Sequence, residues 1–531
     1  MAALTLAPTR NVVILGGSYA GSRAAELLSR TLPSSHRVVV IDRQSHFNHL
    51  YLHPRVSVVP GHAEKVFIPY TGVLPAPPAA SIPAPPPAES TEASDAAASA
   101  VAKAVEEVKE AQKEDAEKAE VKKEENGDSP AAAAEPAAHL ARHVIIHASV
   151  TSINEDFIEV DRDLLEHERD IDGDENEVAK LTDELEAAKL EASVEEKDPA
   201  TRRLSWDYLI YALGCTLPPP LASTYTDKKG GIAFLSSQGE VISRATKILI
   251  AGGGALGIQY ASDIADLYNN PENEEHLKPF LDKDGKRPPK KEITIVHSRD
   301  RFLPLYKKDM HDEITRRLKE LGVKIVLDER LPLPPIEEDR PGEMKTMKRQ
   351  DGSEIEYDLL LRCTGQKPNS QLFREFLPEA LDEYGFVNIR PTLQVDVSKV
   401  PDHEELNLKI RRNIYAIGDV ANAGVIKAGH TGWNQAGVAV QNIMCCVETD
   451  ILNAAEAEEG KEQSEPALVA YERSPPQIKV SLGLAHSCSE LLPAMDAKET
   501  IIQTASNGPV DGYYQVVWQR MGQEGEIDTS L

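Results

Sequence analysis

The sequence predicts an α/β protein with two domains of the same architecture, because a glycine-rich strand–turn–helix pattern occurs in it twice. The first copy, NVVILGGSYAGSRAAELL, begins at Asn11, and the second, KILIAGGGALGIQYASDIADLY, begins at Lys247. Each copy joins an apolar run to a helical pattern, and strands that alternate with helices are typical of parallel sheets. We therefore expect two parallel α/β domains and a small C-terminal α+β piece, interrupted by long low-complexity insertions.

The first turn has small residues at the positions that a Rossmann-like, dinucleotide-binding domain requires. Gly16 allows the chain to reverse, Ser18 keeps the middle position small, and Gly21 allows the helix to pack closely against the strand. The next strand, RVVVID, ends at Asp42, where a carboxylate can accept a hydrogen bond from a ribose hydroxyl. The alternative is a glycine turn without a ligand. If the turn binds a dinucleotide, its pyrophosphate lies at the helix N-terminus, against residues Gly16, Gly17, Ser18, Tyr19, Ala20 and Gly21.

The second turn matches the pattern GxGxxG without substitution, through Gly252, Gly254 and Gly257. Its next strand, EITIVHSRD, ends in His297 and Arg299 rather than in an acid. An acid at this position binds the 2′-hydroxyl of NAD, whereas a basic residue accommodates the 2′-phosphate of NADP. Arg299 therefore favours NADPH or tolerance of both coenzymes, unless it is only a solvated loop residue.

Three later motifs place strands before turns of small residues. In chain order they are WDYLIYALG (206–214), YDLLLRCTG (357–365) and RRNIYAIGDV (411–420). The third ends at Asp419, where a carboxylate can accept hydrogen bonds from the ribityl hydroxyls of a flavin. The following segment, ANAGVIKAGHTGWNQAGVAVQNI, is predicted to be a helix that starts near the flavin ring. The alternative is a strand closed by a Gly-Asp turn.

Charge and cysteine content exclude several functions. Residues 72–139 and 164–200 carry net charges of −8 and −10 out of the total of −28, so the acidity belongs mainly to these two segments. No basic stripe offers a surface for nucleic acid, and we expect no nucleic-acid partner. The five cysteines form no CxxC or CxxxxC pair, which argues against a flavin disulfide reductase and favours a reducing compartment. We predict no metal site.

The chain has no predicted membrane-spanning segment, because no apolar run approaches the ~20 residues that this requires. The N-terminus lacks the pattern of a signal peptide, and Ala2 excludes N-myristoylation. We expect a cytoplasmic protein, and peripheral contact with a mitochondrial or lipid-droplet surface stays open.

The order of the motifs predicts how the domains are divided. One dinucleotide domain takes residues 8–238 and 369–450, and the second takes residues 239–368 between them. The insertion at 72–139 starts with a proline–alanine tract, and the insertion at 164–200 is acidic; both are expected to be disordered or solvated helix. An acidic linker, AAEAEEGKEQSEP (454–466), precedes the C-terminal piece at 467–531.

This order of motifs resembles the pyridine-nucleotide flavin oxidoreductases. It is most similar to the fungal members of their apoptosis-inducing-factor-2 (AMID-like, ferroptosis-suppressor) branch. The segments HPRVSVVPGHAEKVFIPY (53–70), VHSRDRFL (296–303) and IYAIGDVAN (414–422) carry the closer similarity.

The resemblance implies an FAD site and an NAD(P)H site. Arg55 would lie against the flavin, the backbone of Val150 would meet the adenine, and Asp419 would bind the ribityl chain. Gln259 stands where many relatives carry a glutamate close to the nicotinamide. An amide can hold the nicotinamide carboxamide but cannot act as a carboxylate base. The predicted sites comprise Gly16–Gly21, Asp42, Arg55, Val150 and Asp419 for FAD, and Gly252, Gly254, Gly257, Gln259, His297 and Arg299 for NAD(P)H.

The predicted function is an FAD-dependent NAD(P)H oxidoreductase that passes hydride from nicotinamide C4 to flavin N5 and electrons to a quinone-type acceptor. Lys427 and His430, one turn apart after Asp419, are the candidates for charge stabilisation and proton delivery. They could equally be a surface lysine and a packed histidine. A reductase of an electron-transfer protein, a respiratory NADH dehydrogenase, and a redox sensor or apoptosis-inducing-factor-like effector stay open. The aromatic residues of the C-terminal piece fit an acceptor pocket, a membrane-facing edge or a homodimer interface.

Overall fold

The computed structural model describes a single compact unit of the chain. The described residues are 10–74, 143–165, 168, 199–338, 340–458, 463–494, 497–523, 525 and 527–530. Apart from their ends, the predicted insertions at 72–139 and 164–200 lie outside these residues, as does Ala2.

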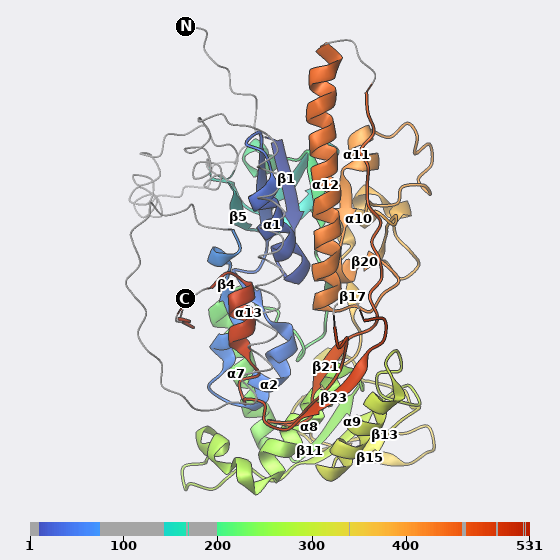
Figure 1. Ribbon diagram of the computed structural model, residues 1–531. Helices are drawn as coiled ribbons and strands as arrows, with labels where there is room; N and C mark the ends of the chain where they lie inside the picture. Colours follow the sequence, from blue (N-terminus) through green and yellow to red (C-terminus); the bar gives the residue numbers. More distant parts are fainter. Residues whose placement is uncertain are drawn as a thin grey trace, which may run out of the picture. The chain divides into compact units, whose positions relative to one another are not determined.

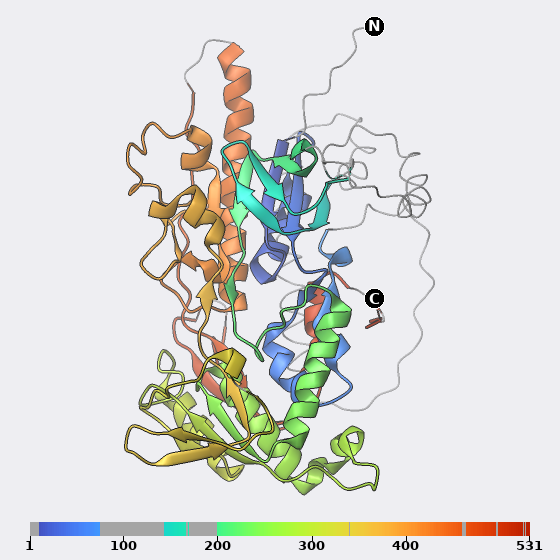
Figure 2. The same cartoon turned by 180° about the vertical axis from the view of Figure 1, so that it is seen from behind.

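The first domain is built on a five-stranded parallel sheet in the order β19-β9-β1-β2-β5. Its aliphatic strands are buried on both faces, as is typical of parallel sheets. Helices α1 and α12 pack together on one face (Figure 1). The small antiparallel sheet β6-β7-β8 covers the other face, and Figure 2 shows it in teal and green. The bounds are β1 (Arg10–Leu15), α1 (Tyr19–Thr31), β2 (His36–Asp42), β5 (Val144–His147), β6 (Val150–Ile153), β7 (Phe157–Val160), β8 (Arg203–Ser205), β9 (Tyr208–Tyr211), β19 (Ile414–Ala416) and α12 (Gly429–Glu458).

The second domain repeats this design with a four-stranded parallel sheet in the order β13-β12-β11-β16. Helices α8 and α9 pack on one face, and the β14–β15 hairpin packs on the other. The bounds are β11 (Lys247–Ala251), α8 (Ala255–Asn269), η5 (Pro271–Phe280), β12 (Glu292–Val296), α9 (Lys308–Glu320), β13 (Lys324–Val326), β14 (Lys345–Lys348), β15 (Glu354–Tyr357) and β16 (Leu359–Arg362).

The C-terminal piece contacts both domains. It consists of the antiparallel strands β21 (Ile478–Ser481), β22 (Ser487–Leu491) and β23 (Ile501–Ala505), and of helix α13 (Tyr514–Arg520). Strand β21 packs against α8, whereas the buried indole of Trp518 donates a hydrogen bond of 2.8 Å to the carbonyl of Lys65. Gly522 approaches Gly72 so closely that a Cβ on Gly522 would lie 1.9 Å from the Gly72 carbonyl oxygen. Because its indole is buried and hydrogen-bonded to Lys65, Trp518 is a core residue.

Shorter elements connect these layers. The chain crosses between the domains through β10 and β17, which pair with each other, and helix α7 leads into β11. The bounds are β3 (His46–Asn48), η1 (Leu50–Leu52), α2 (His53–Val58), η2 (Ala63–Val66), β4 (Phe67–Pro69), η3 (Tyr70–Gly72), η4 (Pro199–Arg202), β10 (Cys215–Thr216), α7 (Lys228–Arg244), η6 (Ile336–Glu338), β17 (Lys367–Pro368), α10 (Gln371–Phe376), η7 (Pro378–Ala380), β18 (Val387–Asn388), α11 (Leu408–Arg412), η8 (Gly418–Val420) and β20 (Ala421–Asn422).

The predicted fold class is confirmed, with two parallel α/β domains and a small α+β piece. Two local expectations were wrong. Helix α12 begins only at Gly429, so Lys427 lies in the loop before it. The helix also runs to Glu458, because the alanines and glutamates expected to form a linker have high helix propensity. Among the described residues, no helix is long and apolar enough to cross a membrane.

Candidate functional site

The first glycine turn forms a cradle with no room for side chains. Gly16 has a φ of +98°, and a Cβ there would lie 2.6 Å from the carbonyl oxygen of Ala212, at the end of β9. A Cβ on Gly21 would lie 1.8 Å from the Gly16 oxygen, so α1 approaches β1 closely. Ser18 makes no capping hydrogen bond, and the first turn of α1 has no acid. The positive end of α1 is therefore free to bind a phosphate.

Asp42 lies beside this cradle at the end of β2. Its Oδ2 accepts a hydrogen bond of 2.6 Å from the backbone N–H of Gly17, and its Oδ1 accepts one of 2.7 Å from Gln44. Burial raises the pKa of the carboxyl, whereas these two N–H groups oppose the rise. The carbonyl of Asp42 accepts from the N–H of Ala148, which brings Val150 to the same edge of the sheet. Asp42 and Val150 thus lie where the adenosine half of a dinucleotide is expected.

Asp419 lies at the other end of the first cradle. Gly418 has a φ of +74° and packs against α1, because an added Cβ would lie 3.4 Å from that of Ala20. The carboxylate accepts a hydrogen bond of 3.3 Å from Gln366. Burial raises its pKa, and the nearby ammonium of Lys427 opposes the rise. The structure therefore brings a carboxylate, an amide and an ammonium group together at the start of α12.

An aromatic cluster that the motifs did not indicate adjoins this end of the cradle. The hydroxyl of Tyr19 lies 2.8 Å from Nδ1 of His49, and the rings of Tyr19 and Tyr51 are 5.2 Å apart. The N–H of Gly429 donates a hydrogen bond of 2.7 Å to the Tyr51 hydroxyl, across 378 residues of sequence. Burial lowers the pKa of His49 to about 3, so its imidazole is neutral. The aromatic residues of segment 47–51 were the available signal, but nothing local showed that they meet α12.

The second glycine turn repeats the first one. Gly252 has a φ of +120°, and a Cβ there would lie 2.4 Å from the carbonyl oxygen of Cys363, at the end of the YDLLLRCTG motif. A Cβ on Gly257 would lie 1.9 Å from the Gly252 oxygen. Open space surrounds Gly254, which begins α8 without a side-chain cap and without an acid in the first turn. This helix end can bind a second pyrophosphate.

Gln259 is buried on α8, with 6% of its surface exposed. Its Nε2 has no hydrogen-bond partner, although the side chain lies close enough to Asp263 to lower the pKa of that carboxyl. A buried amide N–H without a partner is uncommon in proteins and is satisfied when a ligand accepts from it. This orphaned donor fits the predicted contact with a nicotinamide carboxamide, which stays a prediction.

His297 and Arg299 follow β12 at the edge of the second cradle. Nδ1 of His297 lies 3.1 Å from the backbone nitrogen of Gly253, and its Nε2 is buried without a partner. Burial, and next the charge of Arg299, lower the pKa of the imidazole. Arg299 is exposed, and its carbonyl accepts from the N–H of Asp328. His297 therefore lies beside the second cradle, and the charge of Arg299 acts on it.

Arg55 lies in a different environment from the one that the resemblance implied. It is buried on α2 and forms a two-point ion pair with Asp263 on α8, with Nε–Oδ2 at 2.7 Å and Nη2–Oδ1 at 2.9 Å. The remaining N–H groups donate to carbonyls of the C-terminal piece, those of Gly483, Leu484 and Val510. All five N–H groups are thus used within the protein, which leaves only the flat face of the guanidinium for a flavin. Its place beside the flavin stays a prediction.

The two candidates for proton chemistry are separated by the start of α12. Lys427 is half-buried before the helix, and its Nζ donates to the carbonyl of Ala421 and lies 4.5 Å from the ring centroid of Phe386. Burial lowers its pKa, whereas Asp419 opposes that shift. His430 is exposed on the first turn, and desolvation lowers its pKa as well. Lys427 therefore acts on Asp419 through its charge, whereas His430 makes a contact of only 3.5 Å, with Thr431.

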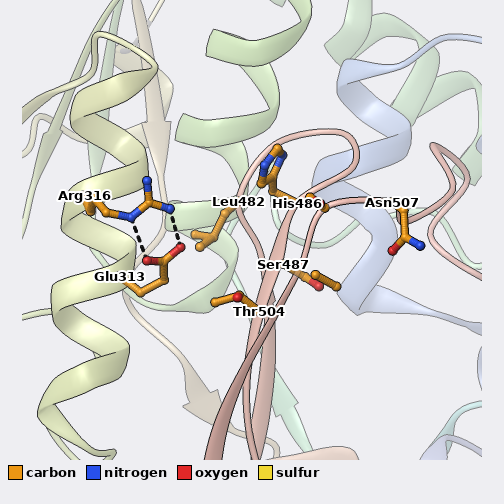
Figure 3. A pocket seen from close by; sticks show the side chains of 9 residues that line it. Glu313, Arg316, Leu482, His486, Ser487, Thr504 and Asn507 are labelled. Atoms are coloured by element: carbon orange, nitrogen blue, oxygen red, sulfur yellow. Dashed lines mark hydrogen bonds and ion pairs between the residues drawn. The ribbon is translucent and has the colours of Figure 1, made fainter. Parts of the chain in front are cut away.

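A pocket of about 510 Å³ lies apart from these residues, between α9, the turn after β21 and the end of β23 (Figure 3). Glu313 and Arg316 form an ion pair of 2.7 Å on one wall, and His486 lies on another. No residue predicted to bind a cofactor lines this pocket. The cofactor sites are therefore defined by the glycine cradles and not by this pocket.

Comparison with known proteins identifies the family. A family model described as pyridine nucleotide-disulphide oxidoreductase matches residues 10–442. The chain belongs to this family. Fe-regulated protein 8 of Mycosarcoma maydis is 30% identical over 524 residues, which cover 97% of this chain and 95% of that protein. Ferroptosis suppressor protein 1 of Homo sapiens is 27% identical over 259 residues, which cover 47% of this chain and 59% of that protein.

Two further comparisons agree with this family of pyridine nucleotide-disulphide oxidoreductases. Apoptosis-inducing factor homolog A of Dictyostelium discoideum is 25% identical over 294 residues, which cover 53% of this chain and 62% of that protein. The solved sulfide:quinone oxidoreductase of Aquifex aeolicus shares the fold, with a TM-score of 0.52 at 10% identity over 96% of this chain and 90% of that one. The predicted resemblance to the apoptosis-inducing-factor-like branch is confirmed.

The cofactors of this oxidoreductase are FAD and NAD(P)H, as the family shows. The residues of the two glycine turns fit FAD and NAD(P)H. Each cradle excludes a Cβ where a pyrophosphate must approach the backbone, and each ends at an uncapped helix N-terminus. The first cradle adds the carboxylates that we predict to bind ribose and ribityl hydroxyls, and the second adds the buried polar side chains of Gln259 and His297.

Proposed function

We propose that this chain is an NAD(P)H:quinone-type oxidoreductase and not a disulfide reductase. The observation that carries the proposal is the presence of two dinucleotide cradles in one compact unit that has no cysteine pair in sequence. When bound, the flavin supplies the chemistry that accepts a hydride from the nicotinamide and releases electrons to an acceptor.

The cysteines form no disulfide bond, and this supports an electron acceptor outside the protein. All five are free, and all five lie among the described residues. Burial raises the pKa of the Cys215 thiol to about 12 and that of Cys488 to about 11. Because the thiolate is the reactive form in disulfide exchange, thiols with raised pKa values are poor redox partners for a flavin.

The residues of the chain would then act by positioning and by charge. The cradles hold the two pyrophosphates, and Gln259 orients the nicotinamide through its free N–H. Lys427 places a positive charge beside Asp419, where negative charge on a reduced ring system would be stabilised. The membrane contact and the homodimer considered from the sequence stay predictions.

Reduction of a soluble ubiquinone analogue tests the proposal. The purified holoprotein should be yellow, should bleach when mixed with NADPH without oxygen, and should turn over rapidly with the quinone. A small disulfide substrate should not be reduced. Rapid disulfide reduction would contradict the proposal.

The same experiment tests the alternative of a redox sensor. A sensor would bleach slowly and keep a long-lived charge-transfer absorption band with the oxidised coenzyme. A colourless protein that does not bind FAD would contradict both functions.

A further inference from the structure

Lys427 lies in a segment that has little backbone support of its own. Residues 423–428, between β20 and α12, form neither helix nor strand. In this described part of the chain, no backbone N–H of residues 424–428 donates a hydrogen bond. The Nζ of Lys427 donates to the carbonyl of Ala421, which precedes the segment. The place of the ammonium group near Asp419 therefore depends on how the far end of the segment is held.

The far end of the segment is held by Tyr51, which lies 378 residues before Gly429 in the sequence. Gly429 is the first residue of α12, so its backbone N–H has no acceptor within the helix. The Tyr51 hydroxyl accepts this N–H at 2.7 Å. A Cβ on Gly429 would lie 3.1 Å from Cδ1 of Tyr19 and 3.3 Å from Cε2 of Tyr51, so the glycine packs against both rings. Tyr51 therefore fixes the residue that lies two positions after Lys427.

Tyr51 is in turn held by the first glycine turn. Its ring centroid lies 5.2 Å from that of Tyr19, the first residue of α1. The Tyr19 hydroxyl lies 2.8 Å from Nδ1 of His49, which fixes the Tyr19 ring. Tyr51 thus connects the first cradle to the start of α12.

We propose that Tyr51 is a positioning residue for Lys427. By accepting the N–H of Gly429, it keeps the segment before α12 where the ammonium group reaches the carbonyl of Ala421, two residues after Asp419. The inference rests on the proposed function, because it explains how the charge that we assign to the reduction of the acceptor is held in place.

Tyr51→Phe tests the inference, because it removes the hydroxyl and keeps the ring. Tyr51 is 42% exposed, so the change leaves the core intact. In the holoprotein, amide hydrogen exchange of the peptide that contains Gly429 should become faster, since this N–H loses its acceptor. The midpoint potential of the bound flavin should become more negative, as in Lys427→Met, because a nearby positive charge favours the reduced flavin.

The two half-reactions should respond differently to Tyr51→Phe. Oxidation of the reduced protein by the quinone should slow about tenfold, which is the scale of one hydrogen bond. Reduction by NADPH should change little, and the flavin content should stay the same.

A double variant separates positioning from a general loss of stability. If Tyr51 acts only through Lys427, Tyr51→Phe/Lys427→Met should have the midpoint potential of Lys427→Met alone. The matched control is Tyr225→Phe, which removes the hydroxyl of another exposed tyrosine and should change neither the hydrogen exchange nor the potential.

An unchanged exchange rate or an unchanged potential in Tyr51→Phe would overturn the inference, as would additive shifts of the potential in the double variant. The outcome is separable from that of the proposed function. A shift that the double variant does not enlarge, in a protein that does not turn over with the quinone, would contradict the function alone. Quinone turnover with the same rate and potential in Tyr51→Phe and the parent would contradict the positioning role alone.

Discussion

Asp42 is the side chain that we predict to adapt the first glycine turn to a ribose. Its two oxygens hold the N–H groups of Gly17 and Gln44, so the carboxylate is fixed before any ligand arrives. An oxygen of a carboxylate retains further lone pairs for a hydroxyl. The turn and the acid are therefore one functional group, and a change in either should weaken FAD binding.

We expect Asp42→Asn to weaken FAD binding about tenfold to a hundredfold, because the amide presents a donor toward one of two backbone donors and loses the negative charge. The flavin band of the purified protein, and its recovery on titration with FAD, would measure this. Asp312→Asn, at an exposed site on α9, is the control. Full flavin content in the Asp42 variant would argue against its assignment to the ribose.

A second prediction at the level of single residues concerns Lys427. Replacement by methionine keeps its length but removes the charge beside Asp419, and quinone turnover should fall about a hundredfold. The flavin content should stay the same, and Lys427→Arg should restore part of the rate. Stopped-flow reduction and steady-state turnover would measure the two half-reactions, with Lys308→Met on the exposed face of α9 as the control. Unchanged turnover would remove Lys427 from the mechanism.

Among the elements, α2 and α8 are joined by a buried charge pair rather than by apolar packing alone. Arg55 lies 208 residues from Asp263 and is also held by three carbonyls of the C-terminal piece. Burial raises the pKa of the Asp263 carboxyl, and the guanidinium opposes this. Removal of one partner therefore leaves the other charge buried without compensation.

Arg55→Ala should lower the free energy of unfolding by about 3–5 kcal/mol. Urea denaturation of the holoprotein would measure it. The double variant Arg55→Ala/Asp263→Ala should lose less than the sum of the two single variants, because neither charge is then left alone. An additive double variant would show that the pair does not couple the elements.

A buried lysine before β12 contacts the C-terminal end of helix α7 and should make stability depend on pH. Lys291 is buried and donates from Nζ to the carbonyl of Ser243 at 2.7 Å, near the last turn of the helix. Burial lowers its pKa to about 7. Because an unfolded lysine titrates near 10.4, the unfolded chain binds more protons between about pH 7 and pH 10.4. The lysine's contribution to the free energy of unfolding therefore rises with pH across this window.

Lys291→Met should remove that part of the pH dependence. Urea denaturation at several pH values from 7 upward would compare the slopes of the two proteins. Lys290→Met, at the exposed neighbouring position, should retain the slope of the parent protein. Identical slopes for Lys291→Met and the parent would show that Lys291 titrates normally in the folded state.

At the scale of the whole molecule, the described residues already account for both sheets and their cores. The insertion at 72–139 has a composition that cannot bury a core of its own. We therefore expect deletion of residues 75–138 to leave quinone turnover unchanged. Turnover and flavin content of the shortened protein would measure this, and a large loss would contradict the division into domains.

The sequence was sufficient to predict those features of the fold and of the site that local backbone geometry determines. The glycines of both turns were predictable because only glycine tolerates the positive φ of Gly16 and Gly252 and the approach of a strand end. The contacts of Arg55 and Tyr51 were not, because their partners lie hundreds of residues away and no local pattern indicates which segments meet. The start of α12 was misplaced because the signal of Gly424 was overlooked: this glycine has a φ of +63°, which interrupts the segment before the helix.

The ties between Arg55 and the C-terminal piece also set an order of events during synthesis. The carbonyls of Gly483, Leu484 and Val510 follow Arg55 by 428, 429 and 455 residues. Since a chain leaves the ribosome from its N-terminus, both dinucleotide domains are complete while this arginine still lacks three of its acceptors. The interface between α2 and α8 is thus finished last, when the final segment of the chain arrives.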